Sequence, residues 1–233
     1  MEHAGTTDVD VHVEIEAQAG DPDSAPRLEA ALRTAGFVPD KERIWRWQTI
    51  VGHGRKAVIK FELLTDNPNA EANATISLPG CERLGAANLR GTGYASMDTA
   101  MHTLAARIDG ELTTVDINVT GLGGFLLAKL AAAHGRRKAK DWYDIAYVLL
   151  HNDAGGPQAA AAHIEATFPG VFRSGSPRTW LVDARANFHD DRSQGTEAYA
   201  DEALLHQPDE ERAQLSTDAK VAMAQFAATF DVS

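Results

Sequence analysis

The spacing of apolar residues changes once along the chain, and this change limits the fold more than any other feature of the sequence. Up to about residue 120, apolar side chains recur at every second position in several segments. From Gly124 onward they follow the wider spacing of amphipathic helices, in segments rich in Ala and Leu. The pattern predicts an α/β domain over residues 1–120 and a helical domain over residues 121–233.

Within the first half, strand patterns and turn residues define the expected elements. The segments that alternate as strands are 7–15, 43–51, 56–64, 74–78 and 111–119. Residues 21–26 have the composition of a loop, and residues 27–35 are expected to form a helix that ends at Gly36. A glycine-rich loop is expected through Gly91 and Gly93. In the second half, residues 155–157 and 174–177 interrupt the helical pattern.

Composition narrows the class of protein. A chain of 233 residues that is 44% hydrophobic and 24% charged can bury a core. The single Cys81 excludes an internal disulfide, and no secretory or membrane-spanning segment is evident, so we expect a cytoplasmic protein with no membrane partner. The formal net charge of -11 excludes general coating of nucleic acid, although a local basic patch could still bind one specific polynucleotide.

The first strand carries a pair of acidic residues. Asp8 and Asp10 alternate with apolar residues, so they point to one face, roughly 7 Å apart at the backbone. Carboxylates in this arrangement can hold the divalent cations that phosphoryl and nucleotidyl transfer require. The preceding Thr6 and Thr7 supply hydroxyl groups and backbone N–H groups near the phosphate side. An exposed edge strand with an acidic outer face is the alternative interpretation, because the Asp-x-Asp spacing alone is a weak signal.

A third carboxylate is expected on a neighbouring strand. Glu62 is the preferred candidate, because it lies on the face of its strand opposite Phe61 and Leu63. Asp116 is a rival on the same argument, and an exposed strand residue is an equally good interpretation of Glu62. His12 and Glu14 continue the acidic face of the first strand and are interpreted as solvated neighbours of the site. The predicted metal ligands are therefore Asp8, Asp10 and Glu62.

The only dense basic cluster of the sequence covers residues 129–144. Lys129 and Arg136 are seven residues apart and share a face if one helix runs through Gly135, and Lys140 extends that face. Such a row suits a triphosphate or an RNA backbone. The alternative is a charged surface in which Arg136 and Lys140 pair with acidic residues of the same segment. The aromatic residues of the segment are expected to be core rather than base-stacking residues; they are Trp142, Tyr143 and Tyr147.

Together the two motifs resemble the AbiEii/AbiGii-like toxin family of the polymerase-β-like nucleotidyltransferase superfamily. The first motif is Thr-Thr-Asp8-Val-Asp10-Val, and the second is Lys129-x6-Arg136-x3-Lys140-Asp141-x-Tyr-Asp144. They stand in the family's order, and the resemblance covers about residues 5–150. It implies an α+β fold, with a mixed-sheet nucleotidyltransferase domain followed by a helical region.

The resemblance also implies chemistry for named residues. Asp8 and Asp10, with Glu62, would bind Mg²⁺ or Mn²⁺, and Lys129 would meet the triphosphate of a nucleoside triphosphate substrate. Asp141 would be an additional catalytic or structural carboxylate. Arg136, Lys140 and Asp144 would support that second site, with Arg136 and Lys140 binding the nucleotide. The acceptor would be an RNA, such as tRNA, or a protein. Because members are often toxins of two-gene systems, a cognate antitoxin is among the expected partners.

The start of the chain departs from the family pattern. Only seven residues precede Asp8, and they lack the Gly-Gly or Gly-Ser signature that the family places before its Asp-x-Asp strand. This departure indicates an N-terminally shortened chain, either through misplacement of the start site or through loss of the loop that cradles the γ-phosphate. It also motivates the alternative function, a catalytically impaired protein that keeps the fold as a scaffold for a partner or a nucleotide.

Overall fold

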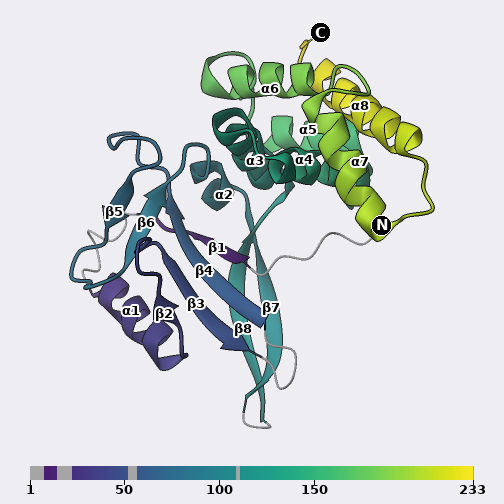
Figure 1. Cartoon of the computed structure of the whole chain (residues 1–233). Coiled ribbons are helices and arrows are strands. Elements are labelled where there is room, and N and C mark those ends of the chain that lie inside the picture. Colours follow the sequence, from purple (N-terminus) through teal and green to yellow (C-terminus); the bar gives the residue numbers. More distant parts are fainter. Residues whose placement is uncertain (1–7, 15–22, 52–56, 109–110, 233) are drawn as a thin grey trace. The chain divides into compact units, whose positions relative to one another are not determined.

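The computed structural model describes the chain except for residues 1–7, 15–22, 52–56, 109–110 and 233 (Figure 1). The described chain forms two compact units that divide between Gly93 and Tyr94. We call residues 4–93 the sheet unit and residues 94–233 the helical unit, and describe each by itself. The boundary predicted at residue 120 corresponds to the start of the first long helix after a β-hairpin, and the structure groups that hairpin with the helices.

The sheet unit is built around one mixed sheet. Its strands are β1 (Asp8–His12), β2 (Val38–Pro39), β3 (Arg46–Val51), β4 (Ala57–Thr65), β5 (Thr75–Ser77) and β6 (Gly85–Asn88). They follow the order β2-β3-β4-β6-β5, and β1 pairs with β4 outside this path. The β1–β4 and β4–β6 pairs are parallel, whereas β2–β3, β3–β4 and β5–β6 are antiparallel. The long strand β4 therefore connects all parts of the sheet.

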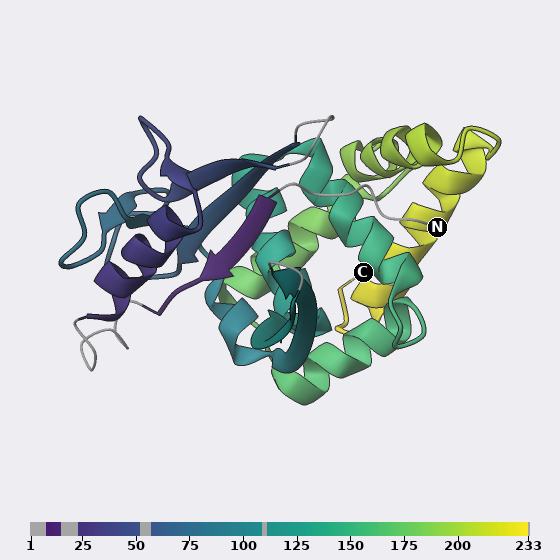
Figure 2. The same ribbon diagram turned by 90° about the horizontal axis from the view of Figure 1, so that it is seen from below.

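Helix α1 (Ser24–Thr34) covers one face of this sheet (Figure 2). Trp47 of β3 and Leu63 of β4 are fully buried against Ala25 and Leu32 of the helix. Strand alternation sends the neighbours of these residues, including Glu62, to the opposite face. Burial of a large apolar side chain stabilises the fold by about 1.5–3 kcal/mol. The core therefore fixes which face of β3 and β4 carries the polar side chains.

The helical unit begins with a short helix and a hairpin. Helix α2 (Gly93–Met97) spans the division between the units, and β7 (Thr99–Ile108) pairs with β8 (Glu111–Thr120) as an antiparallel two-stranded sheet. The six helices that follow are α3 (Leu122–Arg136), α4 (Ala139–His151), α5 (Pro157–Thr167), α6 (Gly175–Asn187), α7 (Gln194–His206) and α8 (Arg212–Ala228). No helix in the described part of the chain is long and apolar enough to span a membrane.

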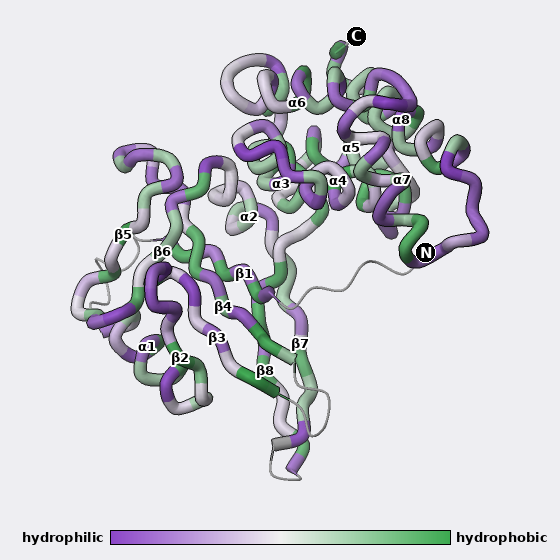
Figure 3. The backbone as a smooth tube through the Cα atoms, viewed as in Figure 1, coloured by the Kyte–Doolittle hydropathy of each residue, from purple (hydrophilic) through white to green (hydrophobic). Residues whose placement is uncertain are grey.

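Buried aromatic residues hold the helices together. Trp142 and Tyr143 of α4 are at most 1% exposed, which confirms their assignment to the core. The ring of Tyr143 stacks on Tyr199 of α7, and Trp142 packs edge-on against Phe188. Figure 3 shows the mixture of apolar and polar residues along each helix that such one-sided packing requires. The mixed sheet followed by helices confirms the predicted α+β class.

Three sequence predictions need correction. Residues 24–26 are not loop but the first turn of α1, which tolerates Pro26 because the N–H groups of a first turn have no partner within the helix. The expected glycine-rich loop includes α2. Strand β7 was not predicted, nor were the short β2 and β6, because Ala100, Ala105 and Ala106 weaken the alternation in β7 and β6 is Gly-Ala-Ala-Asn.

Candidate functional site

The strand register brings the predicted metal ligands to one face of the sheet unit. Asp10 lies opposite Glu62 and Asp8 lies opposite Lys60 in the parallel pairing of β1 with β4. Residues directly opposite each other in a sheet share a face. On the other side of β4, Arg46 of β3 lies opposite Glu62. Three strands therefore present a polar group of five side chains, which we call the carboxylate row: Asp8, Asp10, Arg46, Lys60 and Glu62.

Asp8 and Glu62 of this row accept hydrogen bonds from cations. Lys60 Nζ lies 2.9 Å from Asp8 Oδ1, and Arg46 Nε lies 2.5 Å from Glu62 Oε1. The side chain of Glu62 is 13% exposed, compared with 36% for Asp8. The Glu62 pair is thus better shielded from water, and its charges interact more strongly than those of the Asp8 pair.

The negative charges of Asp8 and Asp10 act on Glu62. Burial raises the pKa of Glu62, and the nearby negative charges of Asp10 and Asp8 raise it further, while Arg46 opposes both effects. Mutual repulsion of this kind is typical of carboxylates that share a cation site. Oxygen donors are also the ligands that Mg²⁺ and Mn²⁺ prefer. The carboxylate oxygens of the row are therefore of the type that binds Mg²⁺ or Mn²⁺.

The present side-chain arrangement is not a preformed metal cage. Within the described residues, no three His, Cys, Asp or Glu side chains are arranged so that they could hold a metal ion. Binding would require the carboxylates to turn away from the positions in which Lys60 and Arg46 hold them. The fit is thus one of donor type and strand register.

Other residues near the acidic strand take different roles. Glu14 is exposed, as expected, whereas His12 is half-buried rather than solvated. Burial lowers the pKa of His12, against the opposing effect of Glu14 and Asp66, and thereby favours the neutral ring. The rival carboxylate Asp116 lies on β8 in the other sheet, where it accepts a hydrogen bond from Thr103. Thr6 and Thr7 lie outside the described residues.

The second motif forms a compact charged cluster between α3 and α4. Helix α3 runs through Gly135, so the condition under which Lys129 and Arg136 share a face is met. Arg136 donates two hydrogen bonds to Asp141, at 2.7 and 2.8 Å. Lys129 Nζ donates to Asp144 at 2.5 Å and lies 3.8 Å from Asp141. We call these four residues the helix clasp.

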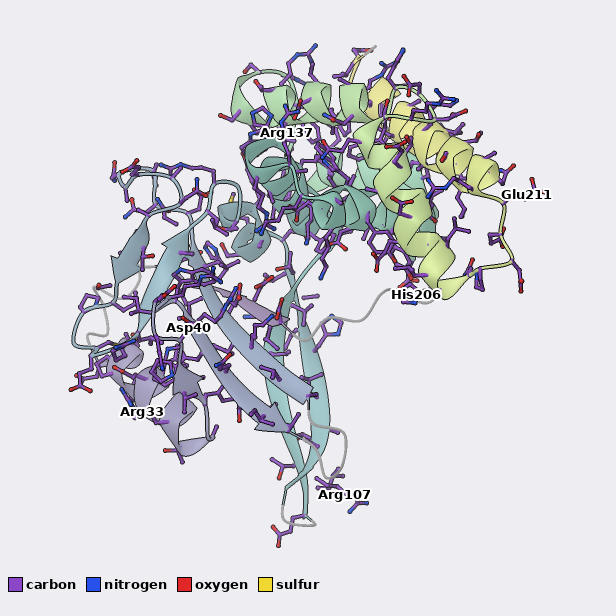
Figure 4. All side chains as sticks on the ribbon, in the orientation of Figure 1. Arg33, Asp40, Arg107, Arg137, His206 and Glu211 are labelled. Atoms are coloured by element: carbon purple, nitrogen blue, oxygen red, sulfur yellow. The ribbon has the colours of Figure 1, made fainter. Side chains whose placement is uncertain are left out.

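The clasp is buried on its acidic side and open on its basic side. Asp141 and Asp144 are 2% and 3% exposed, whereas the Arg136 side chain is 43% exposed. The alternative interpretation, in which Arg136 and Lys140 pair with acidic residues of the segment, holds for Arg136, which pairs with Asp141. Asp144 pairs with Lys129. Lys140 is exposed. Beside the clasp, Arg137 forms an ion pair with Asp183 of α6 (Figure 4). Two balanced charge pairs therefore join the helices.

Comparison with known families identifies the family to which the region containing the helical unit belongs. The family model described as "Nucleotidyl transferase AbiEii toxin, Type IV TA system" matches residues 88–230, which is more than half of the chain. The chain belongs to this family. The matched region of this AbiEii-family protein contains the whole helix clasp and begins at Asn88, after the carboxylate row. No curated protein and no solved structure matches the sequence at a significant level.

Sequence reasoning missed two residues of the carboxylate row. Lys60 and Arg46 contact the predicted ligands directly, but they were not singled out in the sequence. The signal for Lys60 was present, because it lies two residues before Glu62 and therefore on the same strand face. Arg46 could not be placed in this way, since its position opposite Glu62 depends on the register of β3 with β4.

Proposed function

We propose that this AbiEii-family nucleotidyltransferase uses Mg²⁺ or Mn²⁺ to transfer a nucleoside monophosphate from a nucleoside triphosphate to an RNA, such as tRNA, or to a protein. The observation that carries the proposal is the same-face placement of Asp8, Asp10 and Glu62 across the β1–β4 register. It gives the chain the oxygen donors that this reaction needs, in addition to the motif that lies within the family match.

The carboxylate row would hold the metal ion. When bound, the ion would orient the triphosphate and neutralise charge on the leaving pyrophosphate. Asp10 and Glu62 face each other across adjacent strands, so both can reach one ion. The apolar contacts on the opposite sheet face keep the backbone of Glu62 in place, because Leu63 beside it is fully buried.

Within the helical unit, the helix clasp would supply cations that can bind phosphate oxygens. A lysine ammonium has three N–H donors, so Lys129 can keep Asp144 as an acceptor and still donate to a phosphate oxygen. Asp141 orients Arg136 through two hydrogen bonds and leaves part of the guanidinium exposed. In this proposal Asp141 is a positioning residue rather than a group that contacts the reacting atoms, and the exposed Lys140 adds positive charge near the clasp.

The proposal is tested by transfer of label. Purified protein is incubated with Mg²⁺, total tRNA and each α-labelled nucleoside triphosphate in turn, beside an Asp8→Asn/Asp10→Asn variant. A matched control is Glu42→Gln/Glu71→Gln, which removes two exposed carboxylates of the same unit. We expect label on RNA or on protein with the wild type and the control, and none with the Asp8/Asp10 variant. Equal labelling by all three proteins would contradict the assigned metal ligands.

A second candidate function is a nucleotide-binding or partner-binding scaffold without catalysis. The ion pairs that occupy Asp8 and Glu62 favour it, because they neutralise the carboxylates without any metal. This function predicts no label from the wild type, and a cellular effect that survives the Asp8→Asn/Asp10→Asn change. As the family is one of toxins, a cognate antitoxin is the expected partner in either case. Co-expression with the neighbouring gene would test that expectation through restored growth.

A further inference from the structure

Helix α6 borders an open cavity of about 340 Å³ within the helical unit. Five residues line this cavity, which we call the α6 cavity: Val182, Arg185, Ala186, His189 and Val232. None of the five is acidic, and the side chains of Arg185 and His189 carry N–H donors. Its volume lies at the lower end of the range found for ligand pockets. The α6 cavity therefore has the size and the donors for a small anionic group.

The arginine of this cavity lacks an anionic partner. Within the described residues, Arg185 Nε is buried without a hydrogen-bond acceptor, and the guanidinium forms no ion pair. The neighbouring Asp183 is engaged instead by Arg137 at 3.1 Å and by His134 at 3.0 Å. A guanidinium stays charged, and a buried donor without an acceptor costs free energy. An anion bound in the cavity would remove this cost.

A second arginine extends the donors along the same side of α6. Arg178, Arg185 and His189 are seven and four residues apart, a spacing that places side chains on one helix face. Arg178 donates through Nη1 to the backbone oxygen of Phe172 at 3.2 Å, which leaves further N–H groups for a ligand. The two arginines are about 10 Å apart along the helix axis. Such a row suits a chain of negative groups better than one isolated carboxylate.

A phosphate of a nucleic-acid backbone fits this donor set. The guanidinium fork can bind phosphate through two parallel hydrogen bonds, and an imidazole N–H of His189 can add a third. Because the formal net charge is -11, RNA should be held where cations lie without acidic partners. Val182 is 47% exposed and offers an apolar contact for a sugar or a base. RNA is therefore favoured over an acidic protein segment as the ligand.

We propose that the α6 cavity binds a backbone phosphate of the RNA acceptor, with Arg185 as the main donor and with Arg178 and His189 beside it. The inference rests on the proposed function in one respect, because it takes RNA rather than protein as the acceptor. It assigns acceptor binding to residues that belong neither to the carboxylate row nor to the helix clasp.

The test follows the Nε–Hε NMR signal of Arg185 in the full chain labelled with ¹⁵N-arginine, without Mg²⁺ or nucleoside triphosphate. The probes are inorganic phosphate, a short single-stranded RNA and acetate, at equal ionic strength. We expect phosphate and RNA to shift the signal, and acetate to need roughly tenfold higher concentration, because it has less charge and fewer acceptor oxygens. A shift with phosphate but not with RNA would overturn the RNA assignment. Equal responses to acetate and phosphate would overturn it too, in favour of an acidic protein segment.

RNA affinity, measured by fluorescence anisotropy over a series of salt concentrations, gives a second readout. Arg185→Gln should weaken binding about tenfold and reduce the slope of log affinity against log salt by about 0.7, as expected for one lost phosphate contact of a single strand. Arg185→Lys keeps the charge and should keep the slope. Val182→Glu, at an exposed position, should weaken binding as Arg185→Gln does, since the new carboxylate can pair with Arg185.

The matched control is Arg173→Gln, which removes the same charge at an exposed position that does not line the cavity, and it should bind RNA as the wild type does. Equal affinities of Arg185→Gln and Arg173→Gln would overturn the inference and leave the proposed transfer reaction intact. Absence of label transfer, with Arg185 still responding to RNA, would contradict the proposed function and support the cavity as an RNA site.

Discussion

The carboxylate row and the helix clasp contain the same kinds of side chain but differ in how they are shielded. In the clasp, both carboxylates are almost fully buried and each has a cation within 3 Å. In the row, the carboxylate of Asp8 is about a third exposed and its pair with Lys60 faces water. Buried charges that lose a partner are costly, whereas exposed pairs contribute little. The clasp should therefore support the fold, and the row is the region that can exchange its partners for a ligand.

The largest effect is expected from breaking the clasp. Asp141→Ala removes two charge-assisted hydrogen bonds to Arg136 and a charge beside Lys129, and should lower the free energy of unfolding by about 3 kcal/mol. Urea denaturation monitored by circular dichroism measures the change. The exposed Asp153→Ala in the same unit is the control and should stay near the wild type. A decrease in the free energy of unfolding of less than about 1 kcal/mol would show that the clasp contributes no more than an exposed ion pair does.

The helix that carries Lys129 offers the next largest contrast. A Cβ on Gly124 would lie 2.6 Å from the backbone oxygen of Tyr94, so Gly124→Ala should cost about 2 kcal/mol of stability. Gly135, in the last turn of the same helix, has nothing within 4 Å of its added Cβ. Gly135→Ala should therefore stabilise by about 0.5 kcal/mol. Thermal unfolding of the two variants compares the start of α3, where an added methyl group clashes, with its end, where the group has space.

A smaller effect concerns pH in the carboxylate row. Because burial raises the pKa of Glu62 above its ordinary value of 4.5, its ionised form destabilises the folded state relative to the protonated form. This cost is absent below pH 4.5 and appears as the pH rises through the pKa of the folded protein. Stability of the wild type minus that of Glu62→Gln should fall across this window. Carboxyl NMR titration gives the pKa directly, and a value at or below 4.5 would contradict the prediction.

The smallest effect is expected at the exposed pair. Asp8→Asn keeps the shape of the side chain and removes a pair with Lys60 that faces water, so the free energy of unfolding should change by at most about 0.5 kcal/mol. The same urea titration as for Asp141→Ala provides the measurement. A loss comparable to that of Asp141→Ala would remove the proposed difference between the row and the clasp.

The sequence predicted the parts of the site that depend on local periodicity. Alternation placed Asp8 and Asp10 on one strand face, and the seven-residue spacing placed Lys129 and Arg136 on one helix face. It could not identify the partners, because these depend on register and helix packing. The pairing of Lys129 with Asp144 and of Glu62 with Arg46 joins different elements in each case. The hairpin strand β7 was missed for a local reason, since alanine contributes little to a strand pattern.

The position of β1 in the sheet determines how easily the strand that carries Asp8 and Asp10 opens. In the described part of the chain, this five-residue strand pairs with β4 alone, whereas β4 itself pairs with three strands. Edge segments with few neighbours open by local unfolding at a small fraction of the global free energy. The amides of residues 8–12 should thus exchange with solvent before those of β4. A metal ion bound by Asp10 would stabilise the paired form of β1 and slow this exchange.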